Sequence, residues 1–208
     1  MDFLDEKIAS FKQSKRILKE EEIKQKEDST IQEENNTNLS LEEIIECIKN
    51  EYLEIEDRKF DFKTVDYLDG KIRIPMVENY FQEVVKDSNA IALQNETEGV
   101  SFMCSYIKEK ILTKTFDEFK RGMEQNFKDM ELYLEWIEEG DIKKDDMVLE
   151  YGIFKTPTGK GYTYNLIFFM KDNTNTQLIL GNFNCFYKDI TVWENIIKGI
   201  INLVQINI

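Results

Sequence analysis

The stretch GNFNCFYKDITVWENIIKGII, residues 181–201, decides the fold class because a strand pattern passes directly into a helix pattern. Up to Tyr187 apolar and polar residues alternate, which is the period of a half-buried strand. After it, Thr191 and Glu194 have the spacing of a capping box, and apolar residues then recur every three or four positions. Cys185 is therefore expected in a strand and Trp193 in the first turn of a closing helix. We interpret both side chains as core residues and not as reactive groups.

The sequence before this helix predicts a three-stranded antiparallel meander. Its strand patterns are MVLEYGIFKT (147–156), YTYNLIFFMK (162–171) and TQLILGNFNCFY (176–187). Turn residues separate them, first around Gly159 and then in the sequence DNTN. The run LIFF is apolar on both faces, which indicates a central strand that is covered on both sides.

Two further strand pairs are expected upstream. Residues 60–76 alternate on both sides of Asp69 and Gly70, a dipeptide that favours a tight hairpin. Pro75 cannot donate a backbone hydrogen bond, so we expect it at a strand end or at a sheet edge. The patterns NAIALQN (89–95) and GVSFMCSYI (99–107) predict the second pair.

The longest predicted helix begins with a capping box between Thr115 and Glu118 and ends near Gly140. Its apolar stripe consists of Phe116, Phe119, Met123, Phe127, Met130, Leu134 and Ile137. A stripe of Met and Phe packs in a core or forms a groove that adapts to a partner. The candidate partner-binding residues on this helix are Phe116, Phe119, Met123, Phe127 and Met130.

The N-terminal part of the chain predicts an appended arm. Residues 1–27 form an amphipathic helix pattern in which Leu4, Ile8 and Phe11 share one side, and we expect these residues to dock on a partner or on the same chain. Residues 28–40 are polar and predict a flexible linker. The next helix pattern begins after Ser40, with a capping box to Glu43, and runs over 41–54. We expect one domain over 41–208, with its core in 59–208.

Three segments carry a resemblance to a known fold. They are DGKIRIPMVENYF (69–81), LYLEWIEEG (132–140) and LGNFNCFYKDITVWENIIKGI (180–200), and with the order of elements they resemble the PsbP-like or Mog-type superfamily. The resemblance implies an α+β fold in which an antiparallel β-sheet is flanked by helices on both faces, here with an N-terminal helical extension. The superfamily includes Ran-binding factors, bacterial lipoproteins and chaperones of effector proteins. The resemblance therefore implies binding or assembly, and it assigns no contact residue.

Composition argues against several classes of function. The chain has 27 Lys and Arg against 41 Asp and Glu, a net charge of −14, and no basic stripe, so we expect no nucleic-acid partner. No apolar run reaches the length of a membrane span, and the cysteines are few and widely separated, which favours reduced thiols and a cytoplasmic location. The chain has no His and no CxxC motif. We therefore expect no metal, no cofactor and no enzymatic activity.

These observations predict a non-catalytic cytoplasmic protein-binding module, such as an adaptor or a chaperone for a secreted effector protein. The partner is expected to be basic or to expose an apolar segment, because the chain is acidic and carries an apolar Met and Phe stripe. Two alternatives remain open at this stage. One is an acidic, immunity-type inhibitor of a basic toxin, and the other is a carrier of a small ligand held between sheet and helices.

Overall fold

The computed structural model describes residues 39–112, 114–144 and 147–208. Their elements form a seven-stranded antiparallel sheet, a separate four-stranded sheet and three α-helices. The element bounds are α2 Leu41–Lys49, β1 Tyr52–Ile55, β2 Arg58–Tyr67, β3 Ile72–Val77, β4 Gln82–Lys86, β5 Ala90–Asn95, β6 Val100–Lys108, α3 Phe116–Asp129, β7 Glu135–Lys144, β8 Met147–Thr158, β9 Gly161–Lys171, β10 Gln177–Phe186, the 3₁₀-helix η1 Tyr187–Asp189, α4 Ile190–Leu203 and β11 Gln205–Ile206.

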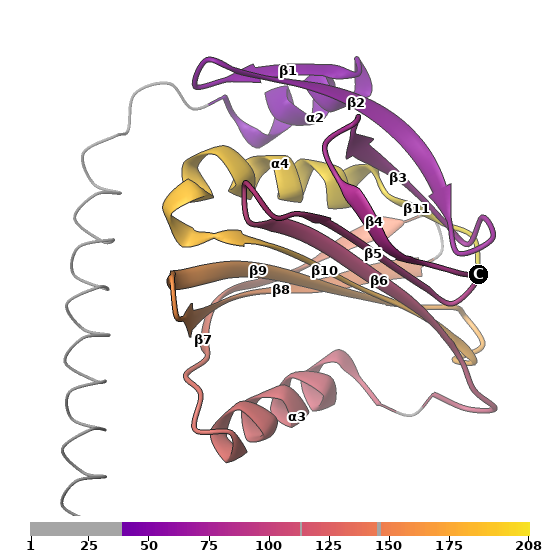
Figure 1. Ribbon diagram of the computed structural model, residues 1–208. Helices are drawn as coiled ribbons and strands as arrows, with labels where there is room; N and C mark the ends of the chain where they lie inside the picture. Colours follow the sequence, from indigo (N-terminus) through magenta and orange to yellow (C-terminus); the bar gives the residue numbers. More distant parts are fainter. Residues whose placement is uncertain (1–38, 113, 145–146) are drawn as a thin grey trace, which may run out of the picture. The chain divides into compact units, whose positions relative to one another are not determined.

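Helices cover both faces of the large sheet, as the sequence predicts. The strand order is β4-β5-β6-β10-β9-β8-β7. Helix α3 lies on one face, and α4 lies on the other, between the large sheet and a layer made of α2 and the small sheet (Figure 1). The fold is therefore α+β, with an antiparallel sheet flanked by helices on its two faces.

The predicted meander is confirmed by β8, β9 and β10, which pair in antiparallel register. Strand β9 lies between the other two, and its residues from Tyr164 to Met170 are all buried. The side chains of Ile167 and Phe169 point to the α3 side, since they belong to the apolar cluster under that helix. Leu166 and Phe168 alternate with them and face α4.

The predicted hairpin over 60–76 is also confirmed, but it belongs to the small sheet, whose order is β1-β2-β3-β11. Leu68, Asp69 and Gly70 form its turn, with φ values of 54°, 56° and 79°. Pro75 pairs with Thr64 of β2, while β11 pairs with β3 only at residues 72 and 73. Pro75 therefore lies where β3 has a single neighbour, which agrees with the edge position expected from its missing N–H group.

Helix α2 begins at its predicted cap, where Ser40 and Glu43 form a capping box. The predicted end at residue 54 is wrong, because the helix ends at Lys49. Asn50 caps it, and Glu51 takes a φ of 62°, which a helix does not allow. The following residues then alternate as strand β1, with Leu53 and Ile55 buried. An apolar residue at 52 satisfied the helical period by coincidence.

Helix α3 starts as expected at the capping box of Thr115 and Glu118, but its predicted end near Gly140 is wrong. The helix ends at Asp129, and Glu131 has a φ of 55°. Gly140 lies inside strand β7, opposite Tyr151 of β8. The stripe positions after Met130 therefore continued the helical period without belonging to the helix.

The quoted stretch 181–201 folds as a strand followed by a helix, with one correction. Helix α4 begins at Ile190, directly after the 3₁₀-helix η1, so Thr191 is not its cap. The apolar side chains of α4 from Ile190 to Ile201 are buried. At Gly199 helix α2 comes so close that a Cβ atom would lie 2.8 Å from Cδ1 of Ile48. Small size at this position allows the two helices to pack.

Candidate functional site

The cysteine and the tryptophan of the quoted stretch are core residues. Cys185 has no exposed surface and Trp193 is 1% exposed. The rings of Phe60 and Tyr80 lie at centroid distances of 5.5 and 5.3 Å from the Trp193 ring, in edge and tilted geometries. Burial raises the pKa of the Cys185 thiol above its ordinary value, and Asp189 and Glu194 add to the effect. A thiol that resists ionisation in a closed core is a poor nucleophile.

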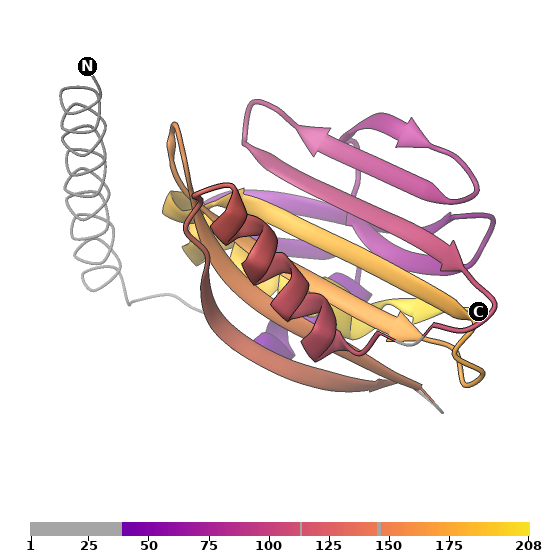
Figure 2. The ribbon, with the colours of Figure 1, turned by 90° about the horizontal axis from the view of Figure 1, so that it is seen from below.

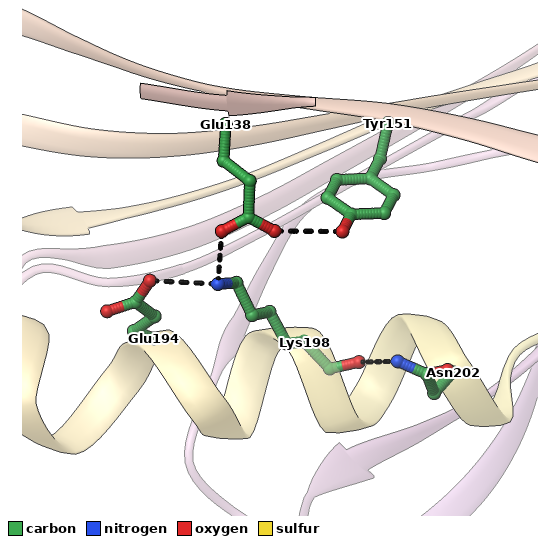
Figure 3. Close-up of polar contacts among 5 residues, drawn as sticks. All are labelled: Glu138, Tyr151, Glu194, Lys198 and Asn202. Atoms are coloured by element: carbon green, nitrogen blue, oxygen red, sulfur yellow. Dashed lines mark hydrogen bonds and ion pairs between the residues drawn. The ribbon is translucent and has the colours of Figure 1, made fainter. Parts of the chain in front are cut away.

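One polar cluster does join the sheet to α4, and it is the strongest candidate for chemistry (Figure 3). Lys198 Nζ lies 2.7 Å from Glu138 Oε2 and 3.0 Å from Glu194 Oε1. The Tyr151 hydroxyl donates to the second oxygen of Glu138 at 2.8 Å. Asn202 Nδ2 donates to the main-chain oxygen of Lys198 at 2.9 Å.

The protonation states of this cluster suit an ion network better than acid–base catalysis. Burial opposes the charge on Lys198, but its hydrogen bonds to Glu138 and Glu194 outweigh that effect and raise its pKa. Burial likewise opposes ionisation of Glu138, and the hydrogen bonds from Lys198 and Tyr151 outweigh it and lower that pKa. Both groups are thus held in their ordinary charged forms. A catalytic lysine or carboxylic acid needs the opposite shift.

Over residues 39–112, 114–144 and 147–208, no three or more His, Cys, Asp or Glu side chains are placed to hold a metal ion. In those same residues no helix is long and apolar enough to cross a bilayer.

The most distinctive surface is the part of the large sheet that α3 leaves uncovered. Figure 2 shows α3 over the β7–β10 side of the sheet, with β4, β5 and β6 beside it and without a helix on this face. We call this surface the open face. Cross-strand pairing and alternation place ten side chains on it: Gln82, Val85, Ala90, Ala92, Gln94, Ser101, Met103, Ser105, Asn182 and Asn184.

The open face carries no ionisable side chain. All ten residues are at least partly exposed, and Met103 and Val85 are 47% and 42% exposed. Since 33% of the chain is charged, an average surface of this size would carry several charges. Depletion of charge and the presence of Met are features of the central parts of protein interfaces.

Both edges of the large sheet are instead protected against strand addition. The edge strand β4 has a bulge between Glu83 and Val85, and the edge strand β7 has one between Trp136 and Glu138. Charged residues follow on each edge, among them Lys86 on β4. Bulges and charges at sheet edges discourage pairing with a strand from another chain.

The structure places the predicted residues of α3 mostly against the sheet. Phe116 is 5% exposed and is a member of an apolar cluster with Phe154, Ile167, Phe169 and Leu178. Phe119, Met123 and Phe127 are half-buried and pack against the same cluster. Met130, at the end of the helix, is 57% exposed. Partner binding by these five residues stays a prediction, and only Met130 offers most of its side chain to solvent.

The other predicted docking residues, Leu4, Ile8 and Phe11, lie outside the described residues, as do the predicted helix over 1–27 and most of the linker over 28–40. Sequence reasoning missed the open face, although a signal was present. In the patterns 89–95 and 99–107 the positions that alternate with the large apolar residues are Ala, Gln, Ser and Met, without a charge. A solvent-facing strand surface usually contains charged residues.

A comparison with solved structures supports the fold. A scan against protein-family models matched none, and a search of curated proteins gave no match. Among solved structures, the solution structure of cyanobacterial PsbP (CyanoP) from Synechocystis sp. PCC 6803 is similar, with a TM-score of 0.55 and 11% identity over 70% of this chain and 92% of that chain. The Ran-binding protein Mog1p of Saccharomyces cerevisiae gives a TM-score of 0.49 and 8% identity over 71% of this chain and 96% of that chain.

Proposed function

The chain has the PsbP/Mog-like fold that its sequence predicts, and on this scaffold we propose a non-catalytic protein-binding module that docks its partner on the open face. The observation that carries the proposal is a row of uncharged, at least partly exposed side chains across four strands, with Val85, Ala92, Met103 and Asn182 side by side. In a protein with so many charged residues, an uncharged exposed surface is typical of a site that a partner covers.

Several observations support a binding role over a catalytic one. The polar cluster around Lys198 is satisfied by internal ion pairs. The buried thiols Cys104 and Cys185 have raised pKa values, mainly because burial disfavours the thiolate. All three cysteines are free, which favours a reducing compartment such as the cytoplasm. An adaptor or a chaperone of another protein, such as a secreted effector, fits these properties.

The acidity of the chain favours a second candidate, an inhibitor of a basic protein. A net charge of −14 steers cationic partners toward the surface and speeds association at low salt.

A small-ligand carrier has less support. One cavity of about 240 Å³ lies between the β2–β3 hairpin and β4, and another of about 200 Å³ lies beside the end of α2. Both volumes are below the roughly 300–1,000 Å³ of typical ligand sites.

The test compares three forms of the full chain as bait in an extract of the native host, with captured proteins identified by mass spectrometry. Met103→Arg places a charge in the middle of the open face. Val148→Arg is the matched control, because Val148 is 46% exposed and lies on β8, three strands away from β6 in the sheet. We expect a stoichiometric partner with the wild type and with Val148→Arg, and its loss with Met103→Arg.

Two results would contradict the proposal. The first is capture of the same partner by all three baits, which would place binding elsewhere. The second is catalytic turnover of a substrate by the purified chain, at a rate that Met103→Arg does not change. The inhibitor is favoured over the adaptor if the captured protein is strongly basic and its association rate falls steeply with salt.

A further inference from the structure

We propose that the open face receives a single amphipathic α-helix of the partner, packed parallel or antiparallel to α3, with a small and apolar stripe toward the sheet and basic residues along its outer flank. The inference rests on the proposed function for the position of the site, and it adds the shape and charge of what binds there.

The mode of binding follows first from what the sheet excludes. Bulges and charges protect the edge strands β4 and β7, so an added strand is disfavoured. A flat surface such as a second copy of the sheet is also disfavoured, because α3 stands on the same face and rises by about one helix diameter, roughly 10 Å. The space beside α3 is thus a step, with the sheet as its floor and the helix as its wall.

The dimensions of the step fit one helix. The floor consists of β4, β5 and β6 together with the part of β10 around Asn182 and Asn184, since Leu178 and Leu180 of β10 pack in the apolar cluster under α3. At a spacing of about 4.8 Å the floor is about 10 Å wide from β4 to β6 and about 14 Å where it reaches β10, while a helix with its side chains is about 10–12 Å wide. Ala92 and Ser101 keep the floor low, and the flexible side chain of Met103 at its centre can adapt to the helix above.

The wall of the step contains a glycine that the packing of the chain itself does not require. Lys120 of α3 contacts Glu139 of β7, and Glu124 contacts Trp136, so this side of α3 faces β7. Because a helix turns 100° per residue, Gly122 lies on the opposite side, toward β6. A Cβ atom at Gly122 would meet no other heavy atom within 4 Å, apart from the helix's own backbone. Glycine costs about 1 kcal/mol relative to alanine inside a helix, and the open space beside Gly122 would allow another helix to approach closely.

The charge of the wall sets the charge of the occupant. Glu118 and Asp129 are exposed, and the helical rotation places them on the outer part of the same side of α3 as Gly122. The chain as a whole is strongly acidic. A helix with Lys or Arg on the flank next to α3 would pair with these carboxylates, while Asp or Glu at the same positions would be repelled.

Synthetic peptides test the proposal without knowledge of the natural partner. Three stapled or linear peptides of about 18 residues are compared: two helical peptides share one Ala and Leu stripe and differ only in Lys or Glu on the flanks, and a third, Val- and Thr-rich peptide favours an extended strand. Binding to the full chain is followed by fluorescence anisotropy and by the methyl NMR signal of Met103. We expect the Lys peptide to shift that signal and to bind at least about tenfold more tightly than the other two.

Gly122→Gln provides the decisive variant, because it fills the step and also improves helix propensity. We expect this variant to unfold at the same or a higher temperature than the wild type and to lose at least about tenfold in affinity for the Lys peptide. Asn126→Gln, one turn further along the same side of α3, is the control, because it exchanges one amide side chain for another and leaves Gly122 unchanged. Equal affinity of Gly122→Gln and the wild type would overturn the proposal, and so would tighter binding of the strand peptide or of the Glu peptide.

The outcome is distinct from that of the bait experiment. If Met103→Arg loses a natural partner while no helical peptide binds, the binding function stands and the helical occupant falls. If sedimentation shows that the wild type is a dimer and Met103→Arg is a monomer, a second copy occupies the face, which also overturns the proposal.

Discussion

Glu138 and Glu139 are neighbours in strand β7, and they hold helices on opposite faces of the large sheet. Glu138 accepts a hydrogen bond from Lys198 of α4 at 2.7 Å, whereas Glu139 pairs with Lys120 of α3. Alternation along a strand sends adjacent side chains to opposite faces. A single strand at the sheet edge thereby fixes both covering helices, and α3 in turn defines the border of the open face.

The ion pair of Glu138 makes stability depend on pH in a defined direction. Burial opposes ionisation of Glu138, but the hydrogen bonds from Lys198 and Tyr151 prevail, so its pKa in the folded chain is below that of the unfolded chain. The carboxylate therefore stabilises the fold above the unfolded pKa of about 4.3, and this contribution is lost as the pH falls through the folded pKa. At pH 7 we expect Glu138→Gln to lower the free energy of unfolding by about 0.5–1 kcal/mol, since the pair is partly exposed.

Urea unfolding at pH 7 and near pH 3 measures this effect. The difference between the wild type and Glu138→Gln should shrink at the lower pH, where the wild-type carboxylate is protonated as well. Glu109→Gln, a substitution at an exposed position, controls for the loss of one negative charge. A difference that stays the same at both pH values would mean that the substitution acts through packing and not through the charge.

Much of the strand content could be predicted because strand and turn signals agree locally. Asp69 and Gly70 form the expected turn, and the strongly apolar β9 is the central, doubly covered strand. The errors fall where a strand continues the period of a preceding helix. Leu134 and Ile137 lie at helical spacing from α3, but the backbone had already left the helix at Glu131. A residue other than glycine in the left-handed region gives no warning in the sequence.

The candidate site was harder to predict than the fold, because it depends on which strands share a face and on what covers them. The spacing of Ala92 and Met103 in the sequence does not reveal that they are direct cross-strand neighbours. The sequence also does not show that α3 ends at Asp129 and covers only the β7–β10 part of its face of the sheet. The open face is therefore a consequence of tertiary arrangement, and its one local sign is the lack of charge in β5 and β6.

The predicted residues of α3 should separate into core and surface by their effect on stability. Phe116 is 5% exposed, with its ring centroid 5.8 Å from that of Phe169. We expect Phe116→Ala to lower the free energy of unfolding by about 3–5 kcal/mol, as for other buried aromatic residues. Met130→Ala, at a position that is 57% exposed, should change it by less than about 0.5 kcal/mol. Urea denaturation followed by tryptophan fluorescence measures both, and similar losses would contradict the assignment of Phe116 to the core.

The three thiols should react in two classes. Cys47 is half-buried on α2, whereas Cys104 and Cys185 are fully buried in strands β6 and β10. Burial raises the pKa of Cys104 to about 12, so almost none of it is thiolate at pH 8. With an aromatic disulfide reagent we expect fast reaction of Cys47 in the native chain, and reaction of the other two only after unfolding in guanidinium. Rapid modification of Cys185 in the folded state, located by peptide mass mapping, would show that the core opens around it.

Gly181 and Phe168 face each other across β10 and β9, and the phenyl ring occupies the space that a side chain at 181 would need. A Cβ atom there would lie 2.1 Å from Cζ of Phe168. Because Phe168 has no exposed surface, its ring cannot move out into solvent. We expect Gly181→Ala to lower the free energy of unfolding by about 1–3 kcal/mol, the usual cost of overpacking a core.

In Gly122→Ala the same change meets open space inside a helix, and it should raise stability by up to about 1 kcal/mol. The double variant Phe168→Leu with Gly181→Ala tests the cause, since relief of the clash makes its loss smaller than the sum of the single losses. Strict additivity in thermal or urea unfolding would show that the ring over Gly181 is not the reason for the glycine.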